Sequence, residues 1–357
     1  MKLSEICSYQ SERVKSNTLS VENYISTENM LPNKSGVSSA SKVPPEAAVL
    51  YKKGDILISN IRPYFKKIWQ AQFSGGCSSD VLCIRANSRV NQDYLYYLLS
   101  QDSFFDYVMA GAKGSKMPRG DKKQIMDWDV ELPKMEEQIR IASLLRSIDD
   151  KIALNNRINH NLEEQADTII ASLIDNYSHN AKLKDISFYV NEKIDTSGFN
   201  IDDYISTENI NPNKSGISTA SSMPECRATV FNAGDTLVSN IRPYFKKIWR
   251  ANKTGVCSND VLCFRSSIST PSSLYHLLRQ DSFFDYVMLG AKGSKMPRGD
   301  KEQIMNWEIP SIIQLCQFEQ ELARIDKKSA SLMAENYNMT KQRDMLLPKL
   351  MSGELTC

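Results

Sequence analysis

The chain has 357 residues, 41% hydrophobic content and a net charge of +2 at neutral pH, which suits two or three domains with cores of their own. No apolar run is long enough to span a bilayer, and the N-terminal MKLSEICSYQSER has no apolar signal core. We therefore expect a cytoplasmic protein without a membrane partner. Eight cysteines with no CxxC pair, and only three histidines, favour buried thiols over a metal site.

The strongest pattern in the chain is an internal repeat. The segment SNIRPYFKKIW occupies residues 59–69 and again residues 239–249. Three further segments recur in the same order at an offset of 179–180: YISTEN at 24–29 and 204–209, QDSFFDYVM at 101–109 and 280–288, and GAKGSKMPRGDK at 111–122 and 290–301. The period far exceeds the roughly 20–50 residues of a solenoid unit. One domain is therefore used twice, and two such copies suit a two-fold object such as duplex DNA.

The first strands of each copy are predicted from turn signals and apolar runs. Gly54-Asp55 predicts a turn into a strand at 56–59, and CSSDVLCIR predicts another strand at 77–85. The spacing of Cys77 and Cys83 would place both thiols on one face of that strand. The same expectation holds for the second copy, with Cys257 and Cys263 at the matching positions.

A helix and a loop follow in each copy. Residues 94–110 have apolar side chains at helical spacing, and we expect their aromatic rings to belong to the core. Residues 111–122 predict a loop, because Pro118 and Gly120 interrupt any helix. Both copies therefore have a mixed α/β pattern.

A long helix is expected after each copy, just beyond Pro133 and just beyond Pro310. Each would run about 40 residues, or roughly 60 Å. Apolar residues recur at steps of four and three along both helices, which predicts a coiled-coil seam. The seam contains Ile141, Leu145, Ile148, Ile152, Asn155, Asn159, Leu162, Ala166, Ile169 and Leu173 in one helix, and Phe318, Leu322, Ile325, Ser329, Leu332, Asn336, Met339, Arg343, Leu346 and Leu350 in the other.

If the two helices pair antiparallel and are centred on each other, Asn155 lies opposite Asn336 and sets the register. The expected fold is therefore mixed α+β, with two repeated α/β domains separated by two long helices that form an antiparallel coiled coil. The expected boundaries are 1–132 for the first domain, 133–179 for the central helix, 180–309 for the second domain and 310–357 for the C-terminal helix.

Positive charge gathers in the repeated segments. SNIRPYFKKIW has three basic residues and no acidic one, and GAKGSKMPRGDK has a net charge of +3. Arginine and lysine clustered on loops are typical of phosphate contact, although each one alone could be a surface charge or part of an internal salt bridge. The candidate DNA-binding residues are Asn60, Arg62, Lys66, Lys67, Lys113, Ser115, Lys116 and Arg119, with their copies Asn240, Arg242, Lys246, Lys247, Lys292, Ser294, Lys295 and Arg298. Asn60 has a second interpretation, as the cap of a turn.

No catalytic motif emerges. The chain has no GxGxxG after a strand, and GAKGSK is too short for a Walker loop. Asp129, Glu131 and Lys134 resemble the carboxylate–lysine group of a nuclease, but the second copy keeps only Glu308 of this group. We therefore expect a non-catalytic binding protein with no catalytic or metal-binding residue of its own. A protein-binding adaptor and a divergent stand-alone endonuclease remain the alternatives.

Several segments together resemble the specificity subunit of Type I restriction–modification enzymes: YISTENMLPNKSG, GDILISNIRPYFKKI, KGSKMPRGDK, ELPKMEEQIRIASLLRSIDDKI and the closing LLPKLMSGEL. The resemblance implies two target-recognition domains on an antiparallel coiled coil, each reading half of a bipartite site in double-stranded DNA. It also implies two methylation subunits as partners, with restriction subunits in the full enzyme. S-adenosylmethionine, ATP and magnesium would bind to those partners, so no cofactor is expected in this chain. Because the candidate segments are identical in both copies, we expect a nearly palindromic target.

Overall fold

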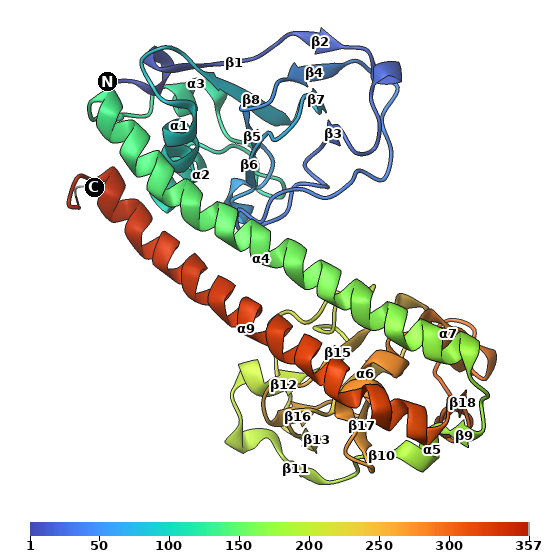
Figure 1. Cartoon of the computed structure of the whole chain (residues 1–357). Coiled ribbons are helices and arrows are strands. Elements are labelled where there is room, and N and C mark those ends of the chain that lie inside the picture. Colours follow the sequence, from blue (N-terminus) through green and yellow to red (C-terminus); the bar gives the residue numbers. More distant parts are fainter. Residues whose placement is uncertain (356–357) are drawn as a thin grey trace. The chain divides into compact units, whose positions relative to one another are not determined.

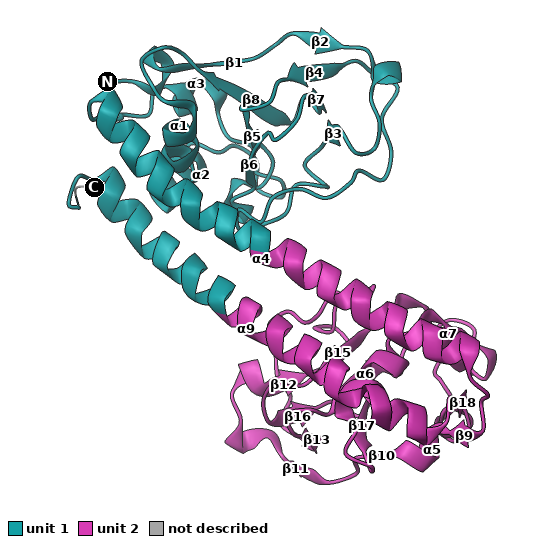
Figure 2. Cartoon of the chain, viewed as in Figure 1, with its two compact units in different colours: residues 1–154, 335–357 teal, residues 155–334 magenta. Residues whose placement is uncertain are grey.

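The computed structural model describes residues 1–355, which divide into two compact units (Figure 2). Unit 1 contains residues 1–154 and the chain from Glu335 onward, and unit 2 contains residues 155–334. Each unit therefore combines one copy of the repeat with one half of each long helix. The predicted boundaries separate each copy of the repeat from the long helix that follows it, whereas the compact units also include the helix segments that pack on each copy.

Unit 1 contains two four-stranded sheets (Figure 1). The first has the order β2 (Arg13–Val14), β4 (Ala48–Tyr51), β7 (Gly75–Cys77) and β3 (Tyr24–Ile25), and the second has the order β1 (Cys7–Tyr9), β8 (Val81–Ala86), β5 (Ile56–Ser59) and β6 (Ile68–Gln70). All neighbouring strands are antiparallel except β3 and β7. The helices are α1 (Gln92–Leu99), α2 (Asp102–Ala110), α3 (Lys122–Met126) and the first half of α4 (Met135–Asn176).

Alternation along β5 divides the core of unit 1 in two. Ile56 and Ile58 pack with the side chains of α1, α2 and the long helices, whereas Leu57 packs with residues of the other sheet. This is the period-two pattern of a strand that is buried on both faces. The second sheet is therefore the middle layer, between the first sheet and the helices.

Unit 2 repeats this arrangement. Its sheets have the orders β11 (Lys193–Asp195), β13 (Arg227–Phe231), β16 (Gly255–Cys257), β12 (Tyr204–Ile205), and β10 (Ser187–Tyr189), β17 (Val261–Ser266), β14 (Thr236–Ser239), β15 (Ile248–Arg250). A small additional sheet pairs β9 (Ala181–Lys182) with β18 (Glu308–Ile309). The helices are α5 (Leu183–Ile186), α6 (Pro271–Leu278), α7 (Asp281–Leu289), α8 (Lys301–Met305) and the first half of α9 (Ile312–Met351), which pack beside the second half of α4.

Two local predictions are wrong. The segment 77–85 is not one strand, because a turn at Ser78–Asp80 carries the chain from β7 into β8, in the other sheet. Cys77 and Cys83 therefore lie on different strands, and they reach the same core from opposing sheets. Cys257 and Cys263 repeat this placement in unit 2. All four thiols are buried, as expected.

The predicted helix at 94–110 is also interrupted. Helix α1 ends at Leu99 and α2 begins at Asp102, with Gln101 in an extended conformation between them. The Ser100 hydroxyl donates to the Tyr96 carbonyl at 2.7 Å, which closes the last turn of α1. The bend lets Phe104 and Phe105 enter the core that also holds Tyr94 and Tyr97, so the expectation of buried aromatic rings is confirmed.

The long helices agree with the predicted starts and lengths: α4 has 42 residues and α9 has 40. Within unit 1, the beginning of α4 packs against the end of α9, with Ile141 and Leu145 in one core with Leu347 and Leu350. Within unit 2, the end of α4 packs against the beginning of α9. The pairing is therefore antiparallel, and none of the predicted seam residues is exposed.

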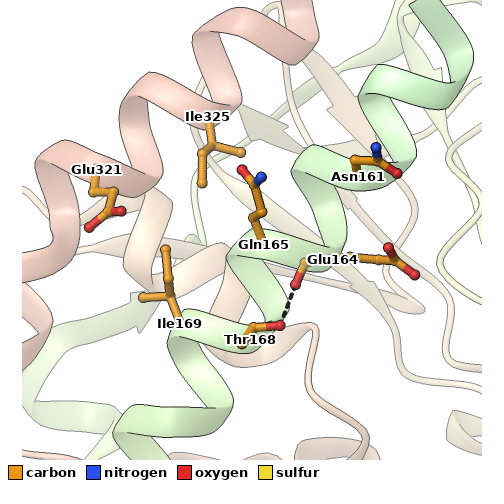
Figure 3. Close-up of a pocket in the computed structure, with 7 residues that line it drawn as sticks. All are labelled: Asn161, Glu164, Gln165, Thr168, Ile169, Glu321 and Ile325. Atoms are coloured by element: carbon orange, nitrogen blue, oxygen red, sulfur yellow. Dashed lines mark hydrogen bonds between the residues drawn. The ribbon is translucent and has the colours of Figure 1, made fainter. Parts of the chain in front are cut away.

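An ion pair in unit 1 and neighbouring side chains in unit 2 support the same alignment of the two helices. In unit 1, Arg343 Nη1 donates to Asp149 Oδ1 at 2.8 Å, across the two helices. In unit 2, Gln165 points toward Ile325 and Ile169 toward Glu321 (Figure 3). Both sets match helices centred on each other. Asn155 is fully buried, and its pairing with Asn336 stays a prediction.

Candidate nucleic-acid interface

The repeated segment after β5 forms a tight turn with unusual backbone angles. Arg62 and Lys66 have φ values of 51° and 50°, on either side of a single 3-10 turn at Pro63–Phe65. This left-handed conformation costs about 1–2 kcal/mol for a residue with a side chain. Pro63 is buried, and the Phe65 amide donates to the Arg62 carbonyl at 3.0 Å. The turn is therefore held in one shape, with Tyr64 and Phe65 at its exposed tip.

A second loop is bonded to this turn. The Arg62 amide donates to the Pro118 carbonyl at 2.8 Å, and the Gly120 amide donates to the Asn60 carbonyl at 3.2 Å. Lys113 and Arg119 exchange two backbone hydrogen bonds of 2.9 Å, which close the loop into a small hairpin. A Cβ atom at Gly120 would lie 2.8 Å from Asn60 Oδ1 and 2.9 Å from Val108 Cγ1, so a larger residue would force these side chains to shift.

A third loop, PNKSG at 32–36, lies against the same turn. Asn33 and Lys34 also have positive φ values, of 54° and 61°. Their amides donate to the carbonyls of Phe65 and Lys66 at 2.8 and 3.0 Å. We call the combined region, residues 32–36, 59–67 and 111–121, the three-loop surface. Its copy in unit 2 consists of residues 212–216, 239–247 and 290–300.

Two of the candidate lysines, Lys66 and Lys67, are partly buried and bound by other residues of the same unit. Asp102, the first residue of α2, lies 2.9 Å from Lys34 Nζ and 3.0 Å from Lys66 Nζ. Burial acts to raise the pKa of this carboxyl, but the two lysines prevail and hold it below its ordinary value. Lys67 Nζ donates to the Thr27 carbonyl at 2.7 Å, and burial lowers the pKa of its ammonium. Lys66 and Lys67 thus stabilise the three-loop surface itself.

The outer candidates are open to solvent. Lys113, Ser115, Lys116 and Arg119 are all exposed. Lys113 pairs with Asp121 at 2.8 Å, and with backbone amides this contact holds the pKa of the carboxyl at about 2. Arg119 lies 3.3 Å from Asp80 and is still 56% exposed. Such exposed pairs are weak, so their cations can exchange partners with a phosphate at little cost.

The balance of charge on the surface is positive. It contains seven basic side chains, which are Lys34, Arg62, Lys66, Lys67, Lys113, Lys116 and Arg119. Within residues 1–355, three acidic side chains pair with them, which are Asp80, Asp102 and Asp121. The difference of seven and three leaves an excess of four positive charges, and an excess of this kind attracts a polyanion.

Unit 2 repeats this surface with nearly the same dimensions. Arg242 and Lys246 both have φ values of 50°, and the Arg242 amide donates to the Pro297 carbonyl at 2.8 Å. Asp281 binds Lys214 and Lys246 at 2.6 and 2.8 Å, and these two lysines lower the pKa of its carboxyl. The Lys247 ammonium donates to the Thr207 carbonyl at 2.5 Å. The exposed members are Lys292, Ser294, Lys295 and Arg298, and Arg298 lies 3.0 Å from Asp260.

Asn60 is 8% exposed, and Asn240 is half-buried. The Oδ1 atom of each is buried without a hydrogen-bond partner, at the base of its three-loop surface. The sequence reasoning missed the roles of Asp102, Lys34 and the aromatic tip. All three belong to segments that are identical in the two copies. That identity was the sequence signal that could have pointed to these residues.

A groove also lies between α4 and α9 in unit 2, away from the three-loop surface (Figure 3). It is an open groove with a mixed lining, which includes Glu164, Gln165, Ile169, Glu321 and Ile325. The described residues hold no group of three or more potential metal ligands there or elsewhere. No helix among them is long and apolar enough to cross a membrane. The three-loop surfaces therefore carry the clearest binding chemistry.

Comparisons with known proteins show similarity to one family over part of the chain. Residues 1–164 match the family model described as "Type I restriction modification DNA specificity domain". The HindI specificity subunit of Haemophilus influenzae is 28% identical over 158 residues, which are 42% of this chain and 34% of that protein. The EcoDI specificity subunit of Escherichia coli is 30% identical over 89 residues, which are 25% of this chain and 20% of that protein. The match thus spans about a third or less of either relative.

The fold is similar to a solved structure over nearly its whole length. The crystal structure of a Type I restriction–modification S subunit from M. genitalium aligns with a TM-score of 0.62. The alignment covers 98% of this chain and 95% of that chain, at 12% sequence identity. This likeness establishes the architecture of two mixed α/β domains and two long helices.

Proposed function

We propose that this chain, whose residues 1–164 match the model of the Type I restriction modification DNA specificity domain, is a DNA specificity subunit in which each three-loop surface reads one half of a bipartite duplex site. The observation that carries the proposal is the presence of two equal surfaces, each with four excess positive charges on preformed loops. Loops held in one shape lose little entropy when they bind, which favours specific recognition.

Within each surface, the residues divide by position. Lys113, Lys116 and Arg119 are exposed cations at the rim, and they suit contact with phosphates or with a guanine edge. Lys66 and Lys67 are occupied by Asp102 and Thr27, and they act by holding the loops together. The same division applies to Lys292, Lys295 and Arg298 against Lys246 and Lys247.

The chain has a non-catalytic role in this proposal. It binds double-stranded DNA and positions two methylation subunits, with restriction subunits in the full cytoplasmic complex. S-adenosylmethionine, ATP and magnesium would bind to those partners. The two long helices offer the partners exposed apolar side chains, including Ile139 and Leu144 on α4 and Met333 and Tyr337 on α9.

The test is duplex binding at several salt concentrations, by this chain alone and with its methylation subunit. We expect weak binding alone, tight binding by the complex, and a steep linear fall of log K with log salt. Binding without salt dependence would instead indicate the protein-binding adaptor. Cleavage of DNA by the chain with magnesium alone would indicate an endonuclease.

A further inference from the structure

Each three-loop surface presents two aromatic rings to solvent. Tyr64 is 47% exposed and Phe65 is 37% exposed, and their ring centroids lie 4.6 Å apart. In unit 2, Tyr244 and Phe245 are 47% and 38% exposed, with centroids 4.7 Å apart. Met117 and Met296, on the neighbouring loops, are also about half exposed, at 49% and 48%. An apolar tip thus stands in the middle of a cationic surface in both copies.

The aromatic tip is not a side effect of core packing. Pro63, between Arg62 and Tyr64, is buried and anchors the turn, whereas neither aromatic residue belongs to a core cluster of unit 1. Left-handed residues lie on either side of the turn, and both rings between them are exposed. Phe188, at 44% exposure, is different: the matching position in the first copy is Ser8. The exposed aromatic pair is therefore present in both copies of the repeat, whereas the exposed Phe188 is present in the second copy alone.

The surroundings of the tip indicate its ligand. Lys67 Nζ lies 5.7 Å from the Phe65 ring centroid, and the loops on both sides carry the positive excess. A ligand that satisfies both features is a polyanion with flat apolar faces. Nucleic-acid bases stack on aromatic side chains, and apolar side chains wedge between base steps while nearby cations hold the phosphates.

We propose that Tyr64 with Phe65, and Tyr244 with Phe245, wedge against a base step of each half-site and partly unstack it. This inference rests on the proposed function. It gives the uncharged aromatic residues a role in DNA recognition. It also predicts that each half-site contains one deformed base step, next to the phosphates that the cations contact. A deformed step contributes specificity through the ease with which its sequence unstacks. It also suits a partner that modifies a base, because such enzymes take the base out of the stack.

The test uses the complex with the methylation subunit and a duplex that contains its modified motif. The variant combines Tyr64→Ala, Phe65→Ala, Tyr244→Ala and Phe245→Ala. Permanganate oxidises unstacked thymines, so its reactivity is mapped across both half-sites and their flanks. We expect one reactive step per half-site with the wild-type complex and none with the variant. The affinity should fall at least about tenfold, since stacking on an aromatic side chain accounts for a change of this order. The salt slope should not change, because the variant removes no charge.

Two controls make the result specific. Phe188→Ala removes an equally exposed ring from β10, at the sheet edge opposite β15, and should change nothing. Tyr64→Phe with Tyr244→Phe keeps the rings and should keep the reactive steps. The inference is overturned if the four-alanine variant retains both reactivity and affinity. It is also overturned if that variant fails to assemble with the methylation subunit, which would make the tip a protein contact. Failure of the proposed function looks different, since the wild-type complex itself would then show no salt-dependent binding.

Discussion

Arg62 and Pro118 belong to different loops, and the amide of the first donates to the carbonyl of the second at 2.8 Å. This bond brings the two most basic segments of the repeat into one surface. Arg242 and Pro297 make the same bond in the second copy. The candidate DNA-binding residues of each domain therefore act together, which leads to the predictions below.

Replacing Arg119 and Arg298 by alanine should weaken DNA binding by the assembled complex. Both side chains are 56% exposed at the rim of the three-loop surface, so folding and assembly should be preserved. If either contacts a base, discrimination at that position should fall by about 1–3 kcal/mol; if either contacts phosphate, the salt slope should shrink. Arg89→Ala is the matched control, because Arg89 is an exposed arginine paired with Glu5 outside this surface. Unchanged binding by the double variant would show that the loop faces away from DNA.

The target should be a palindrome, or nearly one, interrupted by a nonspecific spacer. The two three-loop surfaces have identical sequences from 59 to 67 and from 239 to 247, and their hydrogen bonds match. Identical surfaces read identical half-sites. Sequencing the methylated adenines in cells that carry the complete system reports the motif directly. Two unrelated half-sites would contradict the prediction.

Asp149 and Arg343 should be strongly coupled across the two long helices. Their side chains are 22% and 20% exposed, and Tyr97 Oη donates to the second Asp149 oxygen at 2.7 Å. A double-mutant cycle on unfolding, with alanine at each position, should give a coupling of about 1–3 kcal/mol. Lys151 and Glu335 join the same helices at 3.8 Å and are about twice as exposed, so their coupling should be about 0–1 kcal/mol. Equal couplings for the two pairs would rule out this packing.

Stability should fall in acid as Asp102 and Asp281 become protonated. Lysine contacts lower the pKa of both carboxyls in the folded chain. Their contribution is therefore present above the unfolded value, about 3.9, and is lost as the pH falls through the lower folded value. Carboxyl NMR titration should place both pKa values below the ordinary aspartate value. Asp102→Asn with Asp281→Asn should flatten the acid limb of the stability curve. The control Asp106→Asn with Asp285→Asn changes carboxyls that are exposed as well but form no ion pair with a lysine among the described residues, and it should leave that limb unchanged.

Thiol reactivity should divide the cysteines into two classes. Cys7, Cys77, Cys83, Cys257 and Cys263 are buried, and burial raises the pKa of Cys77 and Cys257 to about 12. Cys226 and Cys316 are exposed. The experiment uses a Cys357→Ser variant, so that only these seven thiols can react. A thiol reagent should therefore modify the two exposed thiols rapidly and the five buried thiols only on unfolding. A third fast thiol in the native protein would show that one of these cores opens.

The sequence alone determined the duplication, the two long helices and their seam, because repetition and heptad spacing are local patterns. It also identified both basic segments, since clustered charge on glycine- and proline-containing loops needs no tertiary information. It did not show that 77–85 crosses between two sheets, because period-two spacing is the same on either side of a short turn.

Only the tertiary structure separated the candidates by role. Lys66 and Arg119 are equally basic in sequence, yet the Lys66 side chain is 29% exposed and bound to Asp102, whereas the Arg119 side chain is 56% exposed beside Asp80. That difference depends on α2 and the repeated turn, which are brought together by a core of residues far apart in the chain. The exposure of Tyr64 and Phe65, which lie in the turn between Arg62 and Lys66, was likewise visible only in the tertiary structure, since their hydrophobicity alone favours burial.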